Sequence, residues 1–199
     1  MRTRRPAVLS IALIIGLTVG LFLAPARAVE PAAPPDPPLI VAAKAADLAA
    51  VNALLAGGTD VQTPDRNKCT ALNWAAYNGA LDVARTLIAH HARIDPHENP
   101  DGWTPLMNAS AMGFADVAAL LIEHGADINT RSTAGGYTPL MYAARKGKKY
   151  VAELLLDHGA RVNDRSDDKR TALDFVDQEK DAAISRLLIA RGGVYGLAH

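Results

Sequence analysis

Three histidines lie close together near the middle of the sequence, and their chemistry would be metal binding. His90, His91 and His97 stand beside Glu98, and imidazole and carboxylate groups both ligate zinc. A zinc site needs three or four side chains that converge on one point. His90 and His91 are adjacent at the expected end of a helix, so their side chains would point in different directions. The sequence therefore predicts no metal site and no cofactor.

Cys69 is the single cysteine of the sequence. It cannot form a disulfide within the chain, so the fold must rest on packing alone. Two roles stay open for it. An exposed thiol in an oxidising compartment could cross-link to a partner or to a second copy, whereas a small, partly buried thiol would have no redox role.

Motifs of known catalytic sites are missing from the sequence. It holds no Gly-x-Ser-x-Gly, no phosphate-binding glycine loop and no His-Glu-x-x-His. The serines have no base and acid at a matching spacing. We therefore predict that the protein is not an enzyme, and a hydrolase or redox protein that uses Cys69 or the three histidines is the alternative.

The distribution of charge argues against a nucleic-acid partner. The formal net charge is zero, and removal of residues 1–28 leaves 17 basic against 21 acidic residues, a net charge of −4. Nucleic-acid binding needs a basic surface. A basic run at residues 145–149 could meet an acidic patch or lipid head groups, but cations at a helix end are stabilised by the helix dipole and by water, and we favour that interpretation.

Short helices at a fixed spacing must position these residues. Thr70, Thr104, Thr138 and Thr171 each open a Thr-x-Leu segment, and their spacings are 34, 34 and 33. Threonine is a good N-cap, and proline fits the first helical position that follows it. The expected ends of the second helices keep the same period, at Gly58, His91, Gly125, Gly159 and Gly192. Such a period is typical of a solenoid of repeats.

Two segments of each period resemble the hallmark segments of the ankyrin-repeat family. They are Gly102-Trp103-Thr104-Pro105-Leu106 and Gly136-Tyr137-Thr138-Pro139-Leu140, and His124-Gly125-Ala126-Asp127-Ile128-Asn129 and His158-Gly159-Ala160-Arg161-Val162-Asn163. The resemblance extends from about Leu39 to Gly193. It implies an all-α ankyrin-repeat solenoid of about five helix-turn-helix repeats, three full and two terminal or degenerate. The family is a scaffold, so its fold does not define a function.

The resemblance also implies where a partner would bind. Hairpin tips and first helices line a concave face in this family, with contact positions just before each threonine and just after each alanine pair. In this sequence they are Asn67, Cys69, Tyr77, Asn78, Asp101, Trp103, Met112, Tyr137, Arg145, Lys146, Arg170, Gln178 and Glu179. We expect Trp103 and Tyr137 to be neighbours, with Tyr77 and Met112 nearby. The alternative to a binding hot spot is that these aromatic residues only pack the hairpins.

Residues 1–28 are typical of a secretory signal peptide. Arg2, Arg4 and Arg5 precede an apolar run from residue 8 to residue 24, and Ala26-Arg27-Ala28 fits a cleavage site with a mature start at Val29. An uncleaved membrane anchor is the alternative. We expect a proline-rich linker over residues 29–38, the repeat domain over 39–193 and a frayed tail over 194–199.

Together these patterns predict a non-catalytic module for protein–protein interaction in the bacterial periplasm, or a secreted one. We expect a monomer that scaffolds or protects an exported enzyme, with no nucleic acid and no membrane contact after signal cleavage. The alternative is an inhibitor or immunity protein that occludes a toxin or a hydrolase.

Overall fold

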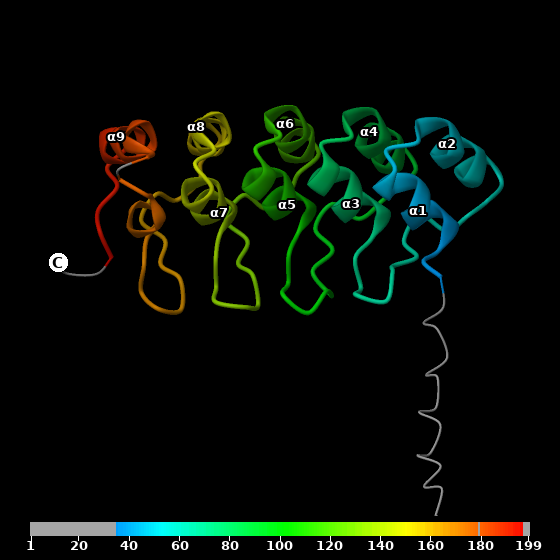
Figure 1. The fold of residues 1–199 in the computed structure, drawn as a ribbon, viewed down its shortest axis with the longest axis horizontal. Helices are drawn as coiled ribbons and strands as arrows, with labels where there is room; N and C mark the ends of the chain where they lie inside the picture. Colours follow the sequence, from blue (N-terminus) through cyan, green and yellow to red (C-terminus); the bar gives the residue numbers. More distant parts are fainter. Residues whose placement is uncertain (1–34, 179, 197–199) are drawn as a thin grey trace, which may run out of the picture. The chain divides into compact units, whose positions relative to one another are not determined.

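The computed structural model describes residues 35–178 and 180–196, and this part of the chain holds helices and no strand (Figure 1). The predicted signal peptide, most of the predicted linker, Glu179 and residues 197–199 lie outside it. None of the described helices is long and apolar enough to cross a membrane. The helices are α1 (Pro38–Lys44), α2 (Leu48–Ala56), α3 (Ala71–Asn78), α4 (Leu81–Ala89), α5 (Pro105–Met112), α6 (Ala115–Glu123), α7 (Pro139–Arg145), α8 (Lys149–Asp157), the 3-10 helix η1 (Ala172–Phe175) and α9 (Ala182–Ala190).

The helices form five consecutive pairs, which we number as repeats 1 to 5. In Figure 1, α1, α3, α5, α7 and η1 make one row, and α2, α4, α6, α8 and α9 make the second row. Each first-row helix packs against the first-row helix of the next repeat and against its own second-row partner. The segments that join successive repeats form hairpins that extend from the first row, away from the second (Figure 1). This arrangement confirms the predicted solenoid.

The first-row helices begin where the threonine spacing predicts. The hydroxyls of Thr70, Thr104 and Thr138 accept hydrogen bonds from the backbone N–H three residues later. Pro105 and Pro139 occupy the first helical position, where a missing N–H is harmless. The described α-helices have seven to nine residues. Helices of this length are too short to be stable in isolation, so their stability comes from packing between repeats.

The core repeats with the same period as the sequence. The leucines of the Thr-x-Leu segments are fully or almost fully buried, and they are Leu72, Leu106, Leu140 and Leu173. The second-row helices α4, α6 and α8 each contribute a fully buried leucine, and these are Leu87, Leu121 and Leu155. Alanine pairs lie between these layers and let successive helices approach closely. Ser110 interrupts that pattern in repeat 3, because Ala76 and Ala144 hold the equivalent positions in repeats 2 and 4. All three residues are fully buried, and the Ser110 hydroxyl has no hydrogen-bond partner among the described residues.

A buried polar side chain closes the base of each hairpin. Asp65, Asn99, Ser132 and Ser166 are all buried. Each bonds the backbone of the residue that precedes the capping threonine, which is Cys69, Trp103, Tyr137 or Arg170 respectively. The backbone is therefore fixed at one of the predicted contact positions, the residue just before each capping threonine.

The C-terminal end differs from the prediction of a frayed tail. Val194 donates its N–H to Asn163 Oδ1 over 2.9 Å, and its carbonyl accepts from the Thr171 hydroxyl over 2.7 Å. Gly196 N–H donates to Asp174 Oδ2 over 2.6 Å. Residues 194–196 are thus tied to repeat 5, whose first helix is a single 3-10 turn. At the other end, Pro38, the last residue of the predicted linker, is the first residue of α1.

Candidate functional site

Five of the predicted contact residues meet at one groove between repeats 2 and 3. The groove has a volume of about 490 Å³, within the range of pockets that hold small ligands or side chains. Repeat 2 contributes Asn67, Cys69, Asn73, Trp74 and Tyr77, and repeat 3 contributes Asn99, Pro100, Asp101, Trp103 and Asn108. Sequence reasoning identified Asn67, Cys69, Tyr77, Asp101 and Trp103, and it missed the other five.

Trp103 is the most firmly positioned residue of the groove. Its carbonyl oxygen accepts from Asn99 Nδ2 over 2.7 Å and from Asn73 Nδ2 over 3.0 Å. Its N–H donates to Asn99 Oδ1 over 2.7 Å. Asn73 comes from the preceding repeat, so it fixes repeat 3 against repeat 2. In the ankyrin resemblance this position, just after the Thr-x-Leu segment, usually holds a histidine, and asparagine makes the link here.

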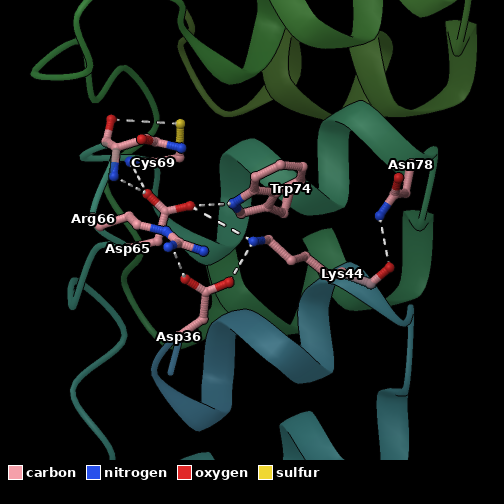
Figure 2. Close-up of polar contacts among 8 residues, drawn as sticks. Asp36, Lys44, Asp65, Arg66, Cys69, Trp74 and Asn78 are labelled. Carbon is pink, nitrogen blue, oxygen red and sulfur yellow. Dashed lines mark hydrogen bonds and ion pairs between the residues drawn. The ribbon is translucent and has the colours of Figure 1, made fainter. Parts of the chain in front are cut away.

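Asp65 positions the opposite wall of the groove (Figure 2). Its side chain is 1% exposed. Oδ1 accepts from the backbone N–H groups of Asn67 and Cys69, over 2.8 and 3.0 Å, and Oδ2 accepts from the indole Nε1–H of Trp74 over 3.0 Å. A single buried carboxylate therefore shapes the hairpin tip and orients the Trp74 ring.

A lysine from repeat 1 completes this network. Lys44 donates to Asp36 Oδ2 over 2.6 Å, lies 3.9 Å from Asp65 Oδ2, and holds its ammonium 4.2 Å from the centre of the Trp74 ring. Figure 2 shows Lys44 reaching the ring from the α1 side. The hydrogen bond from Lys44 is the main cause that lowers the pKa of Asp36 below its usual value. A cation thus already occupies the side of Trp74 that faces away from repeat 3.

The aromatic side chains of this face form two clusters, one on each side of Asn108. Trp74 and Tyr77 pack edge to face with ring centres 5.8 Å apart. Beyond the groove, Tyr142 packs against Trp103 at 4.3 Å and against Tyr137 at 5.6 Å. The expected neighbours Trp103 and Tyr137 are therefore joined through Tyr142, and Tyr77 lies with Trp74 in the other cluster.

A single position in the repeat explains both clusters. The fourth residue after each capping threonine is Trp74, Asn108, Tyr142 or Phe175. Three repeats place a large ring there, and repeat 3 places an asparagine. The groove is open where the ring is missing. Comparison of this position between the repeats would have found Trp74 and Tyr142 from the sequence.

The other predicted contact residues that the structure describes lie outside the groove. Asn78 donates to the Lys44 carbonyl over 2.9 Å, and Gln178 donates to the Tyr195 hydroxyl over 2.6 Å. Arg170 lies 5.4 Å from the centre of the Phe175 ring and 3.4 Å from Asp168. Met112, Arg145 and Lys146 are exposed, Tyr137 is half-buried, and Glu179 is not described.

The structure favours a packing role for Cys69. Its Sγ lies 3.8 Å from the Asn67 carbonyl, and the side chain is half-buried. Burial raises the pKa of the thiol, and the carboxylate of Asp65 raises it further. A thiol with a raised pKa holds less of the reactive thiolate at neutral pH.

The histidines that the structure describes do not gather into a metal site. Among residues 35–178 and 180–196, no three histidine, cysteine or acidic side chains are placed to share a metal ion. His97 Nδ1 lies 2.9 Å from the Asp95 carbonyl. His124 and His158 each place Nδ1 within 2.9 Å of the carbonyl four residues earlier, at the end of α6 and α8.

Comparisons with known proteins agree with this architecture. A family model described as "Ankyrin repeats (3 copies)" matches residues 39–132, and a second, "Ankyrin repeat", matches residues 135–167. A curated relative, "Ankyrin repeat domain-containing protein 49" of Bos taurus, is 48% identical over 61 residues. That alignment covers 30% of this chain and 26% of the relative, so the chain spans about a quarter of the relative's length.

Proposed function

Because the chain belongs to the ankyrin-repeat family, we propose that it is a non-catalytic module that binds a partner protein across the groove between repeats 2 and 3. Ankyrin repeats are generally modules for protein–protein interaction. The observation that carries the proposal is Trp103, whose backbone is held by three side-chain hydrogen bonds at the wall of an open groove.

A fixed aromatic anchor favours binding for a physical reason. Association costs free energy when loops and side chains become ordered, and a side chain that is already fixed adds little to that cost. Tryptophan and tyrosine are also enriched among the residues that dominate interface energies. Trp103 meets both conditions, since its backbone is bonded and its ring rests on Tyr142.

The proposal includes export to the periplasm. The arginines at positions 2, 4 and 5, the apolar run that follows and the small residues at 26 and 28 support it. N-terminal sequencing of the protein recovered from a periplasmic fraction should give Val29 as the first residue. Recovery of the chain in the membrane fraction with its first residues intact would contradict cleavage.

The binding proposal is tested by isolating the tagged protein with its bound partners from extracts of the source cells. Trp103→Ala should weaken binding of a stoichiometric partner by about 2 kcal/mol or more. The matched control is Tyr150→Ala, because Tyr150 is 78% exposed on α8 and lies outside the groove. Circular dichroism should show unchanged helix content in both variants. A partner that tolerates Trp103→Ala and is lost with Tyr150→Ala would overturn the assignment of this face.

A further inference from the structure

We propose that the groove between repeats 2 and 3 binds an arginine side chain presented by the partner. This inference rests on the proposed function and adds the chemistry of the occupant. Among the described residues that line the groove, Asp101 alone carries a formal charge. Its side chain is exposed, and no described residue forms an ion pair with it.

The aromatic rings that line the groove with Asp101 also favour a positively charged occupant. The faces of tryptophan and tyrosine rings are negative, so a cation near Trp74, Tyr77 or Trp103 is attracted to them. The protein already uses this chemistry beside the groove, because Lys44 holds its ammonium over Trp74 between the carboxylates of Asp36 and Asp65. Lys44 lies on the α1 side (Figure 2), whereas the groove lies on the side of repeat 3.

Hydrogen-bond acceptors in the groove select arginine over lysine. No described residue donates to the side-chain oxygens of Asn67 and Asn108, although Asn108 itself donates to the Thr104 carbonyl over 3.3 Å. Together with the Asp101 carboxylate, these two amide oxygens give the lining of the groove several separate acceptors. A guanidinium group is planar, carries five N–H donors and stacks on aromatic rings, whereas an ammonium is a compact charge. An acidic side chain in this space would be repelled by Asp101.

The two tryptophans of the chain provide the measurement. The sequence contains two, and both Trp74 and Trp103 line the groove. Their indole N–H signals in NMR therefore report occupancy directly. The protein, purified from cells that express the full chain, is titrated with four capped tripeptides, Gly-X-Gly, in which X is arginine, lysine, glutamate or citrulline. Citrulline has the shape of arginine without its charge.

The arginine peptide should shift the Trp103 indole signal in a saturable way. The lysine and citrulline peptides should bind about tenfold more weakly or worse, because citrulline lacks the charge that pairs with Asp101 and the compact lysine ammonium lacks the planar set of N–H donors. Asp101→Asn should weaken arginine binding by a similar factor. The control Asp82→Asn, at an exposed site on α4, should leave it unchanged.

Several results would overturn the proposal. They are equal binding of arginine and citrulline, equal binding of arginine and lysine, absence of any shift up to the solubility limit, and arginine binding that Asp101→Asn leaves intact. Asn108→Phe provides a second variant, because it places a ring where Trp74 and Tyr142 stand in their repeats, and it should abolish the shift while helix content stays the same. A partner whose capture depends on Trp103, combined with no arginine preference, would remove this inference and leave the proposed function standing.

Discussion

Equivalent positions of the repeat form an open groove between repeats 2 and 3 and a closed aromatic cluster in repeats 4 and 5. In repeats 4 and 5, Tyr137 packs edge to face against Tyr142 at 5.6 Å and against Phe175 at 5.3 Å. Tyr142 is 5% exposed there. In repeat 3 the equivalent of Tyr142 is Asn108, and the space beside it is open.

The comparison shows how a repeat protein acquires a site without changing its fold. The capping threonines and the buried leucines are the same at both places, and a buried polar side chain closes the base of each hairpin. One substitution within the repeat, a ring replaced by a carboxamide, separates a closed surface from an open one. Polar residues around the open surface, Asn73 and Asn99, then fix the tryptophan that borders it.

The largest effect on the free energy of unfolding is expected when the aromatic cluster of repeats 4 and 5 receives the asparagine that repeat 3 has at the equivalent position. Tyr142→Asn should reduce the free energy of unfolding by about 3–4 kcal/mol, because it removes a buried ring and its contacts with Trp103 and Tyr137. Urea denaturation measures the loss. Tyr150→Asn, at the exposed tyrosine of the same repeat, is the control and should change the free energy by less than about 0.5 kcal/mol. Equal losses in the two variants would refute a packing role for the cluster.

A smaller effect is expected at the base of the groove. Asp65→Asn can still accept from the Cys69 N–H, as Asn99 does from Trp103, but an amide cannot serve all three donors and also face Lys44. We expect a loss of about 1–2 kcal/mol in the free energy of unfolding.

The same variant should move the indole signal of Trp74 and leave that of Trp103 in place. This separation is the sharper check, because general loosening of the stack would move both signals. An unmoved Trp74 signal would contradict the hydrogen bond from its indole N–H to Asp65.

The periodic elements were predictable from the sequence because their causes are local. The threonines cap the following helix, and the glycines and His91 take positive φ angles, and each signal repeats at one spacing. The groove was only half predictable. Asn73, Asn99 and Asn108 act through contacts between repeats, and within a helix or a turn they look like ordinary polar residues.

The same reasoning applies at the two ends of the repeat domain. The hydrogen bonds of Val194 and Gly196 reach back to Asn163 and Asp174, and no local pattern marks them. The density of prolines before residue 39 predicts a linker that includes Pro38, although proline is also favoured at the first position of a helix.

A matched pair of substitutions compares repeats 3 and 4 at their buried small residues. Ser110→Ala should raise the free energy of unfolding by about 1 kcal/mol, because it removes a buried hydroxyl that has no partner among the described residues. Ala144→Ser should lower it by about 1 kcal/mol for the same reason. Thermal unfolding of both variants at one pH checks the signs. A loss on Ser110→Ala would indicate that the hydroxyl has a partner in solution.

The smallest effect concerns Asp36, which joins repeat 1 to the network beneath the groove. The hydrogen bond from Lys44 lowers the pKa of this carboxyl below its ordinary value of 3.8. A group whose pKa is lower in the folded protein stabilises the fold above its unfolded pKa, and that contribution is lost as the pH falls through the folded value. The stability difference between the wild type and Asp36→Asn should therefore stay constant from neutral pH to about pH 5 and shrink below pH 3.8. Because Lys44 is 32% exposed, salt should reduce the difference at neutral pH. A difference that is independent of both pH and salt would mean that the ion pair between Asp36 and Lys44 contributes nothing to the stability of the fold.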